Sequence, residues 1–290
     1  MNALRKSICV EDDSYLSFLS PAKVNLFFRV LYKREDGFHE IASLYQAISL
    51  FDTLYFKKSG SPRLTCTDPT LACDETNLVA KAEHLFRKHT GITEPVHIHL
   101  RKKIPMQAGL GGGSSNAATA LFGLNRLFGE PVTESDLCEW AKTLGSDVAF
   151  FLSSGTAYCT GRGEKIEELQ HPLPELHFSL AKPVGGLSTP LVYRHCDVAR
   201  LSSVDPASTL EGFLMGDPHY YNDLEQSAFS LMPSLREVKE ALLVSGFSHV
   251  VLCGSGSAFF CLGTSKEKIS LPLQFFTGKS VQRRYGRWYE

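Results

Sequence analysis

Glycines crowd the start of an amphipathic helix pattern near the middle of this chain. Residues 105–116 read Pro-Met-Gln-Ala-Gly-Leu-Gly-Gly-Gly-Ser-Ser-Asn, and apolar residues then recur with helical spacing from 117 to 128. Glycine adopts positive φ without a Cβ clash, so successive backbone N–H groups of such a loop can converge on one anion. The dipole and free N–H groups of the following helix would point at the same anion. The pattern therefore predicts a phosphate-binding loop.

Other interpretations of this loop fit less well. A flexible Gly/Ser linker would not follow a strand-like segment at 96–100 and run straight into a helix. The Walker loop needs lysine after its last glycine, and the dinucleotide fingerprint needs a third glycine, but Ser114 stands at both positions. Ser114, Ser115 and Asn116 are good N-cap residues, so we expect them to cap the helix.

Composition limits the classes of partner. The 290 residues carry a formal net charge of -1, which gives no general electrostatic case for binding nucleic acid or an anionic membrane. No apolar run reaches about 18 residues, and the N-terminus turns acidic before any apolar stretch of useful length. We expect a cytoplasmic protein that acts on a small molecule.

Cysteine and histidine give little support for a metal site. The eight cysteines contain no C-x-x-C pair and mostly lie in apolar stretches, which favours reduced, buried thiols over disulfides or zinc. His97 and His99 alternate on one predicted strand face, a spacing that is compatible with metal ligands. Because no third ligand follows at a suitable spacing, we expect two exposed strand histidines and no metal site.

Strand and helix patterns do not alternate regularly, which predicts an α+β fold. Strand-like runs at 15–19, 24–31, 42–50 and 52–57 precede helical patterns at 77–89 and 133–144, which flank the glycine loop and its helix. Beyond residue 160 the chain becomes richer in proline, with short strands at 177–181, 249–253 and 258–262 and helices at 222–231 and 234–244. We therefore predict domains at 1–160 and 161–290.

Two charged residues outside the loop are candidates for chemistry. Lys23 and Asn25 lie two apart on a predicted strand, and so on one face, which apolar Phe27 shares. A surface lysine on a first strand is the alternative. Asp147 precedes a run of apolar residues at a predicted helix start, where it could instead only cap the helix.

The motifs together resemble the GHMP kinases. Pro105 to Asn116 is similar to the phosphate loop of that superfamily, and Gly254-Ser-Gly-Ser-Ala258 resembles its third motif. Pro21-Ala-Lys-Val-Asn-Leu26 and Gly145-Ser-Asp-Val-Ala-Phe-Phe151 resemble the branch that phosphorylates 4-diphosphocytidyl-2-C-methyl-D-erythritol. The departures are Ala149 in place of the usual proline, and Gln107-Ala108 where the branch often has two glycines.

The resemblance implies a two-domain fold, an activity and a set of site residues. The N-terminal domain would resemble domain 2 of ribosomal protein S5, and the C-terminal domain would be ferredoxin-like. The implied reaction transfers the γ-phosphoryl group of ATP, which brings Mg²⁺, to the 2-hydroxyl of that substrate in the non-mevalonate isoprenoid pathway. Lys23 and Asp147 would be catalytic. The nucleotide would contact Pro105, Met106, Gln107, Ala108, Gly109, Leu110, Gly111, Gly112, Gly113, Ser114 and Ser115, with Asn77 and Leu78 near the adenine.

The same resemblance places the acceptor's cytosine between aromatic side chains. Phe38 and His39 would form one wall of the pocket, Tyr193 the other, and Asn25 and Thr189 would contact the substrate. Tyr193 could equally be ordinary helix core. Another GHMP activity, of homoserine or mevalonate kinase type, is the alternative enzyme, and a nucleotide sensor on this fold would have lost Lys23 or Asp147. We expect a monomer or weak homodimer.

Overall fold

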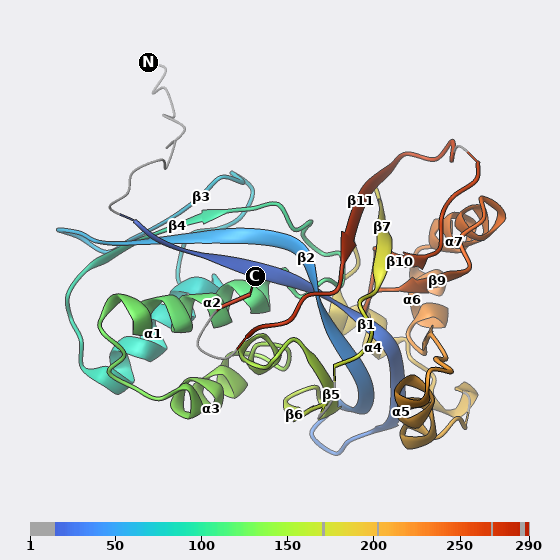
Figure 1. Ribbon diagram of the computed structural model, residues 1–290, viewed down its shortest axis with the longest axis horizontal. Coiled ribbons are helices and arrows are strands. Elements are labelled where there is room, and N and C mark those ends of the chain that lie inside the picture. Colours follow the sequence, from blue (N-terminus) through green and yellow to red (C-terminus); the bar gives the residue numbers. More distant parts are fainter. Residues whose placement is uncertain (1–14, 170–171, 202, 268, 285–287, 290) are drawn as a thin grey trace.

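Two β-sheets and the helices packed on them make up the computed structural model, which describes residues 15–169, 172–201, 203–267, 269–284 and 288–289 (Figure 1). The first sheet has strand order β3-β4-β2-β1-β8, and β5 pairs with both β2 and β6. Its strands are β1 (Leu16–Lys33), β2 (His39–Lys58), β3 (Arg63–Cys66), β4 (Val96–Arg101), β5 (Thr156–Gly161), β6 (Lys165–Glu168) and β8 (Tyr221–Asn222). The second sheet, in order β11-β7-β10-β9, has β7 (His177–Pro183), β9 (His249–Leu252), β10 (Phe259–Leu262) and β11 (Leu273–Lys279).

Strands β1 and β2 are far longer than the sequence predicted. The four expected segments merge into one antiparallel pair of 18 and 20 residues. Pro21 pairs with Phe51 but the next residue, Ala22, pairs with Ile48, so two extra residues of β2 bulge out opposite the proline. A bulge tolerates the missing proline N–H and bends the pair without ending it. The predicted strands at 42–50 and 52–57 are therefore one continuous strand, β2.

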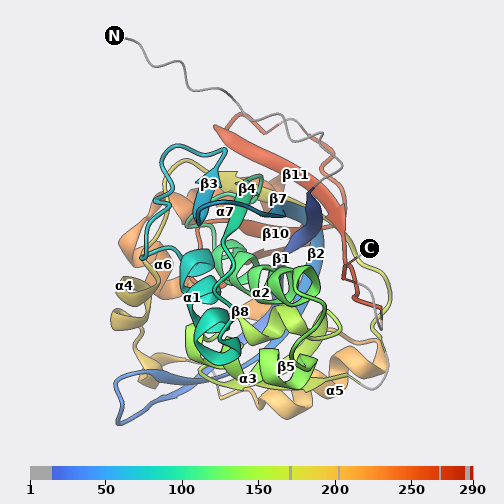
Figure 2. The same cartoon turned by 90° about the vertical axis from the view of Figure 1, so that its left-hand side faces the viewer.

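Helices α1 (Leu78–Thr90), α2 (Gly112–Leu127) and α3 (Glu134–Leu144) cover one face of the first sheet, where Figure 2 shows them in front. Residues 115–125 of α2 are all buried. The expectation that Ser114, Ser115 and Asn116 cap α2 is wrong. Gly111, with φ of 69°, is the N-cap residue, so winding begins a turn earlier and Ser115 lies inside the helix with its hydroxyl 2.8 Å from that of Ser20.

The C-terminal half builds on β1 and returns to the first core. Strand β8 pairs in parallel with β1, and after β11 the residues Val281, Trp288 and Tyr289 are buried in the cluster beneath α2. The remaining helical segments are η1 (Ala149–Leu152), α4 (Thr189–Arg194), η2 (Val198–Arg200), α5 (Pro206–Met215), α6 (Glu225–Leu231) and α7 (Ser234–Val244). The α+β prediction is confirmed. The domain boundary at 160 stays a prediction, and β6 lies beyond it within the first sheet.

His97 and His99 are not the exposed pair that the sequence predicted. His99 is buried, and the Thr65 hydroxyl of the neighbouring strand β3 lies 2.8 Å from His99 Nδ1 and 2.9 Å from His97 Nε2. The sequence did not predict β3, which pairs with β4 and places the Thr65 hydroxyl beside both rings. Strand β11 and helix α5 were also missed.

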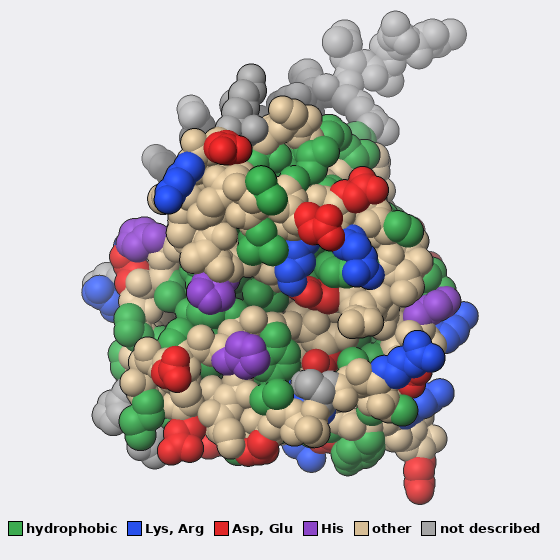
Figure 3. All heavy atoms as spheres, turned by 90° about the vertical axis from the view of Figure 1, so that its right-hand side faces the viewer, with side chains coloured by type: hydrophobic (Ala, Val, Ile, Leu, Met, Phe, Trp, Pro, Cys, Tyr) green, Lys and Arg blue, Asp and Glu red, His purple; other side chains and the backbone are tan. Residues whose placement is uncertain are grey.

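The molecular surface is mixed in character. Figure 3 shows acidic and basic side chains interspersed on the face that lies to the right in Figure 1, in keeping with the near-neutral net charge. In the described parts of the chain, no helix is both long and apolar enough to cross a bilayer.

Candidate active site

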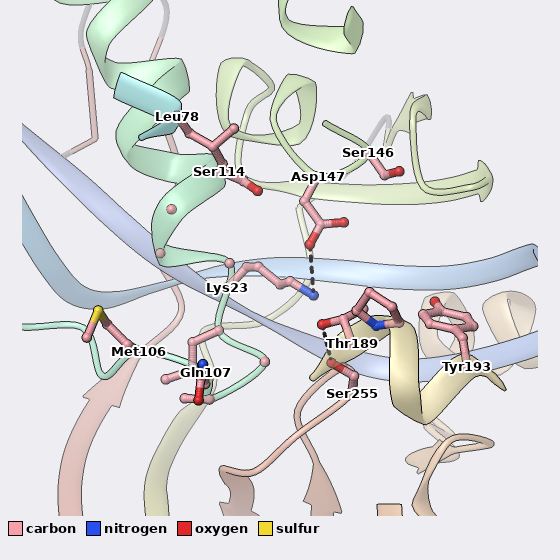
Figure 4. A pocket seen from close by; sticks show the side chains of 18 of the residues that line it. Lys23, Leu78, Met106, Gln107, Ser114, Ser146, Asp147, Thr189, Tyr193 and Ser255 are labelled. Carbon is pink, nitrogen blue, oxygen red and sulfur yellow. Dashed lines mark hydrogen bonds and ion pairs between the residues drawn. The ribbon is translucent and has the colours of Figure 1, made fainter. Parts of the chain in front are cut away.

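A cleft of about 930 Å³ lies where the glycine loop, β1, α4 and the β9–β10 loop meet. Most of the residues that the sequence singled out line this cleft. They are Lys23, Phe38, His39, Asn77, Leu78, Asp147, Thr189, Tyr193 and the loop residues from Pro105 to Ser114. Asn25 and Ser115 are not among its lining residues, because both side chains are buried behind it. Figure 4 shows Lys23 and Asp147 between Leu78 and Ser114 on one side and Thr189 and Tyr193 on the other.

The glycine loop ends as a helix N-terminus that opens into the cleft. Helix α2 begins at Gly112, directly after Gly111 in the left-handed conformation, and Ser115 N is the first amide to bond back to the Gly111 carbonyl, at 2.9 Å. The amides of the preceding residues, 112 to 114, have no acceptor within the helix, as at any N-terminus. They form a cradle for an anion, and the helix dipole adds partial positive charge there.

Asp52, wholly buried on β2, anchors both ends of this loop. Its Oδ1 accepts hydrogen bonds from the Lys103 and Ile104 amides at 2.7 and 2.9 Å, just before the loop. Its Oδ2 pairs with the Lys102 ammonium and accepts from Asn116 Nδ2 of α2 at 2.9 Å. The loop is therefore fixed at its start and at its helix by one carboxylate, and Lys102 is held at the cleft wall.

The C-terminal glycine loop packs against the first one. The Ser257 and Ala258 amides donate to the carbonyls of Gln107 and Ala108, at 3.3 and 3.1 Å. Gln107 has a φ of 51°, which is uncommon for a residue with a Cβ. The two halves of the chain thus meet along the backbone of the phosphate-binding loop, and Ser255 reaches the cleft from the second half.

Lys23 is 3% exposed, and its ammonium has defined partners. Its Nζ donates to Asn25 Oδ1 at 2.8 Å and lies 3.6 Å from Asp147 Oδ2. Asn25 in turn donates to Ser43 Oγ at 2.9 Å, and the Lys23 amide donates to the Leu110 carbonyl at 2.9 Å. The β1 backbone therefore links the lysine to the glycine loop, and the alternative of a solvated surface lysine does not hold.

Asp147 stands in the turn before η1, with its carboxylate turned into the cleft (Figure 4). Its Oδ1 accepts a hydrogen bond from the Tyr45 hydroxyl at 3.1 Å, and its Oδ2 faces Lys23. The residue at the N-cap of η1 is Val148, so Asp147 is not the helix cap that the sequence left as an alternative. The carboxylate is held between a cation and a phenol, with 28% of its side chain exposed.

Aromatic rings gather at the other end of the cleft. The His39 and Tyr193 rings are 5.3 Å apart between centroids and inclined by 33°, while Phe38 is 52% exposed beside them with the Arg162 guanidinium 4.8 Å from its ring. Burial, with a smaller effect from Lys33, lowers the pKa of His39, so its imidazole is neutral at neutral pH. Burial, reinforced by Asp147, raises the pKa of the Tyr193 phenol.

Tyr193 fits both interpretations that the sequence left open. It packs against the core cluster of the C-terminal half and also lines the cleft. Helix α4 presents it together with Thr189, whose hydroxyl oxygen is 2.7 Å from Ser255 Oγ (Figure 4). This contact joins α4 to the second glycine loop.

Several cleft residues were not predicted as site residues. These are Tyr45, Lys102, Ser146, Arg162, Arg194 and Ser255. Lys102 could have been predicted, because it is a basic residue only three positions before Pro105. Ser255 could also have been predicted, because it lies within the motif Gly254-Ser-Gly-Ser-Ala258. No sequence pattern marked Tyr45 as a site residue, because an aromatic residue on a strand is typical of the hydrophobic core. In the described parts of the chain, no three His, Cys, Asp or Glu side chains are grouped to hold a metal ion.

Comparisons with known proteins agree with this geometry. The family model "GHMP kinases N terminal domain" matches residues 77–155, and "GHMP kinases C terminal" matches residues 210–271. A 4-diphosphocytidyl-2-C-methyl-D-erythritol kinase of Protochlamydia amoebophila is 46% identical over 276 residues, covering 94% of this chain and 93% of the relative. A chloroplastic kinase of the same name from Arabidopsis thaliana is 44% identical, covering 87% of this chain and 68% of the relative.

Solved structures agree at the level of the fold. A crystal structure of 4-(cytidine 5'-diphospho)-2C-methyl-D-erythritol kinase, 35% identical, superposes with a TM-score of 0.76 over 91% of this chain and 99% of the other. Homoserine kinase from Cytophaga hutchinsonii superposes with a TM-score of 0.70 over the whole of both chains at 19% identity. At that identity the likeness concerns the fold alone.

Proposed function

This chain belongs to the GHMP kinases, and we propose that it transfers the γ-phosphoryl group of ATP to the 2-hydroxyl of 4-diphosphocytidyl-2-C-methyl-D-erythritol. The products are the 2-phosphate and ADP, in the non-mevalonate route to isoprenoid precursors. The observation that carries this proposal is the position of the Lys23–Asp147 pair, 3.6 Å apart, between an anion cradle and an aromatic clamp in one cleft.

The nucleotide would occupy the glycine-loop end of the cleft. Backbone N–H groups at the start of α2 would hold the phosphates, and the absence of side chains at Gly111 to Gly113 lets the phosphates approach the backbone. Asn77 and Leu78, at the N-terminus of α1, line the same end and are the candidates for contact with the adenosine. Lys102 lines the same wall, with its ammonium paired to Asp52.

The chemical step needs one base and one cation. The acceptor oxygen forms a bond to the γ-phosphorus, the bond from that phosphorus to the bridging oxygen breaks, and ADP leaves with the electron pair. We propose that Asp147 accepts the proton of the acceptor hydroxyl. Lys23 would stabilise the negative charge on the transferring phosphoryl group. Positioning dominates such a reaction, and Asn25 supplies it by holding the Lys23 ammonium.

The acceptor's cytosine would lie in the clamp formed by Phe38, His39 and Tyr193. A pyrimidine ring stacks on an aromatic face, and a neutral imidazole can hydrogen-bond the pyrimidine edge. Thr189 would contact the part of the acceptor nearer to the reacting hydroxyl. Homoserine and mevalonate carry no base and would leave this clamp empty.

Magnesium fits this site as a companion of the nucleotide. Mg²⁺ usually keeps several waters and binds through one or two carboxylates plus substrate phosphates. The cleft offers the Ser114 hydroxyl at its phosphate end, and the nucleotide's phosphates and water would supply the other oxygen ligands. When bound, the ion would neutralise phosphate charge.

A coupled assay of ADP release tests the proposal. The enzyme would receive ATP with 4-diphosphocytidyl-2-C-methyl-D-erythritol, homoserine or mevalonate as acceptor. We expect turnover with the cytidine compound to exceed that with the other two by at least about 10³ in kcat/KM, since a base bound by stacking and hydrogen bonds contributes several kcal/mol. Comparable rates with homoserine or mevalonate would refute the assignment.

A further inference from the structure

Tyr45 reaches the reacting carboxylate from a position on β2 that no motif covers. In the pairing of β2 with β1 it lies directly opposite Asn25, and on its other side it pairs with Ala157 of β5. This register places its side chain on the face of the sheet that carries Lys23 and Asn25. The phenol is 2% exposed, lies under the Lys23 ammonium at 4.5 Å from the ring centroid, and donates to Asp147 Oδ1 at 3.1 Å.

We propose that Tyr45 is a positioning residue for phosphoryl transfer, which fixes the Asp147 carboxylate and strengthens its anionic form through the phenol hydrogen bond. The inference rests on the proposed function, in which Asp147 receives the acceptor proton. With Oδ1 held by Tyr45 and Oδ2 facing Lys23, the plane of the carboxylate is set at both oxygens. The lone pairs left over point into the cleft, where the acceptor hydroxyl would lie.

The phenol acts as a donor and does not compete for the proton. Burial, reinforced by the neighbouring Asp147, raises the pKa of Tyr45 well above its usual value. Its ring packs edge-on against Phe150 at 5.2 Å between centroids, which restricts the side chain. The acceptor proton therefore passes to Asp147 while Tyr45 keeps its own.

Titratable groups face Asp147 from several of the surrounding elements. Lys23 on β1 and Tyr45 on β2 touch it, while Cys159 on β5 and Tyr193 on α4 lie near enough for Asp147 to raise their pKa values. Burial is the larger cause for both of those groups and keeps them neutral. Lys23 and Tyr45 are thus the two of these groups that contact the carboxylate directly.

Tyr45→Phe removes only the hydroxyl and keeps the ring contacts. We expect kcat to fall roughly three- to thirtyfold, because a hydrogen bond to a charged group is lost, while the KM values for ATP and the acceptor stay within about twofold. The acidic limb of the pH profile of kcat should move to higher pH, because a carboxylate that loses a donor holds its proton more readily. Replacing Tyr45 by 3-fluorotyrosine, a more acidic donor, should move the limb the opposite way.

Tyr158→Phe is the matched control, since Tyr158 follows Ala157 on β5 and so points to the other face of the sheet. Its pH profile should equal that of wild type. The positioning role would be overturned if the acidic limb of the pH profile of kcat stayed in place in Tyr45→Phe. It would also be overturned if the variant had a lower melting temperature and weaker ATP binding but an unchanged kcat. Asp147→Asn separates the two proposals, because wild-type turnover in that variant would refute the base assignment itself, whatever Tyr45→Phe does.

Discussion

Gly109 lies so close to Cys253 that a Cβ on Gly109 would stand 1.8 Å from the Cys253 carbonyl oxygen. Gly109 belongs to the phosphate-binding loop, and Cys253 precedes the C-terminal glycine loop. The clash is with backbone, so no side-chain rotation relieves it. Gly109 also has a φ of 76°. The glycine at this position is thus required by the junction between the two halves of the chain, as well as by the nucleotide.

Gly109→Ala should therefore separate the two loops. We expect the KM for ATP to rise about tenfold or more and the free energy of unfolding to fall by about 1 to 3 kcal/mol, because the backbone must shift to admit the methyl group. Steady-state kinetics and denaturant unfolding measure the two effects.

Gly129→Ala serves as its control. Gly129 has nearly the same φ, 77°, but a Cβ there would meet nothing within 4 Å. The cost of positive φ is common to both variants, so their difference isolates the contact with Cys253. Equal effects in the two variants would show that the loop junction tolerates the methyl group.

Asp147→Asn tests the proposed base. The amide keeps the shape of the side chain but accepts no proton, so kcat should fall by about 10² or more while calorimetric ATP affinity stays nearly unchanged. Asp217→Asn, at an exposed carboxylate on the C-terminal side of α5, should leave kcat as in wild type. Near wild-type turnover in Asp147→Asn would remove that residue from the mechanism.

Local sequence motifs predicted the main residues of this site. The glycine loop, Lys23 and Asp147 each lie in a motif whose chemistry follows from neighbouring residues, and the structure brings all three to one cleft. Tyr45 and Asp52 were missed because their partners come from strand register and from segments far along the chain. The bulge opposite Pro21 and the return of Trp288 to the first core are likewise long-range effects that no local pattern encodes.

Buried histidines should make stability depend on pH. Burial lowers the pKa of His99, and burial with nearby Arg63 lowers that of His97. A group whose pKa is lower in the folded state binds protons more readily when unfolded. Stability is therefore full above about pH 6.5, the unfolded value, and falls as the pH drops below it toward the folded value.

Thermal unfolding between pH 7.5 and pH 5 would measure this loss. His99→Asn, which keeps a polar group near Thr65, should flatten the decline, whereas His84→Asn at the exposed face of α1 should leave its slope unchanged. An unaltered slope in His99→Asn would contradict the assignment of the decline to this strand.

The aromatic clamp gives the last prediction, because it distinguishes this kinase from relatives whose acceptors carry no base. Stacking of a base on an aromatic side chain contributes about 1 to 3 kcal/mol, so Phe38→Ala or Tyr193→Ala should raise the acceptor KM roughly 5- to 150-fold. The KM for ATP should not change, since the Lys23–Asp147 pair separates the clamp from the glycine loop (Figure 4).

His39 should add discrimination between pyrimidines to that affinity. Its neutral imidazole can pair with the edge of cytosine, and stacking alone accepts either pyrimidine. His39→Ala should therefore narrow the ratio of kcat/KM between the cytidine and uridine forms of the acceptor. Truncations of Phe38 and Tyr193 that raised the KM for ATP, and left that of the acceptor alone, would identify the aromatic end as the adenine pocket and reverse the orientation proposed for the two substrates.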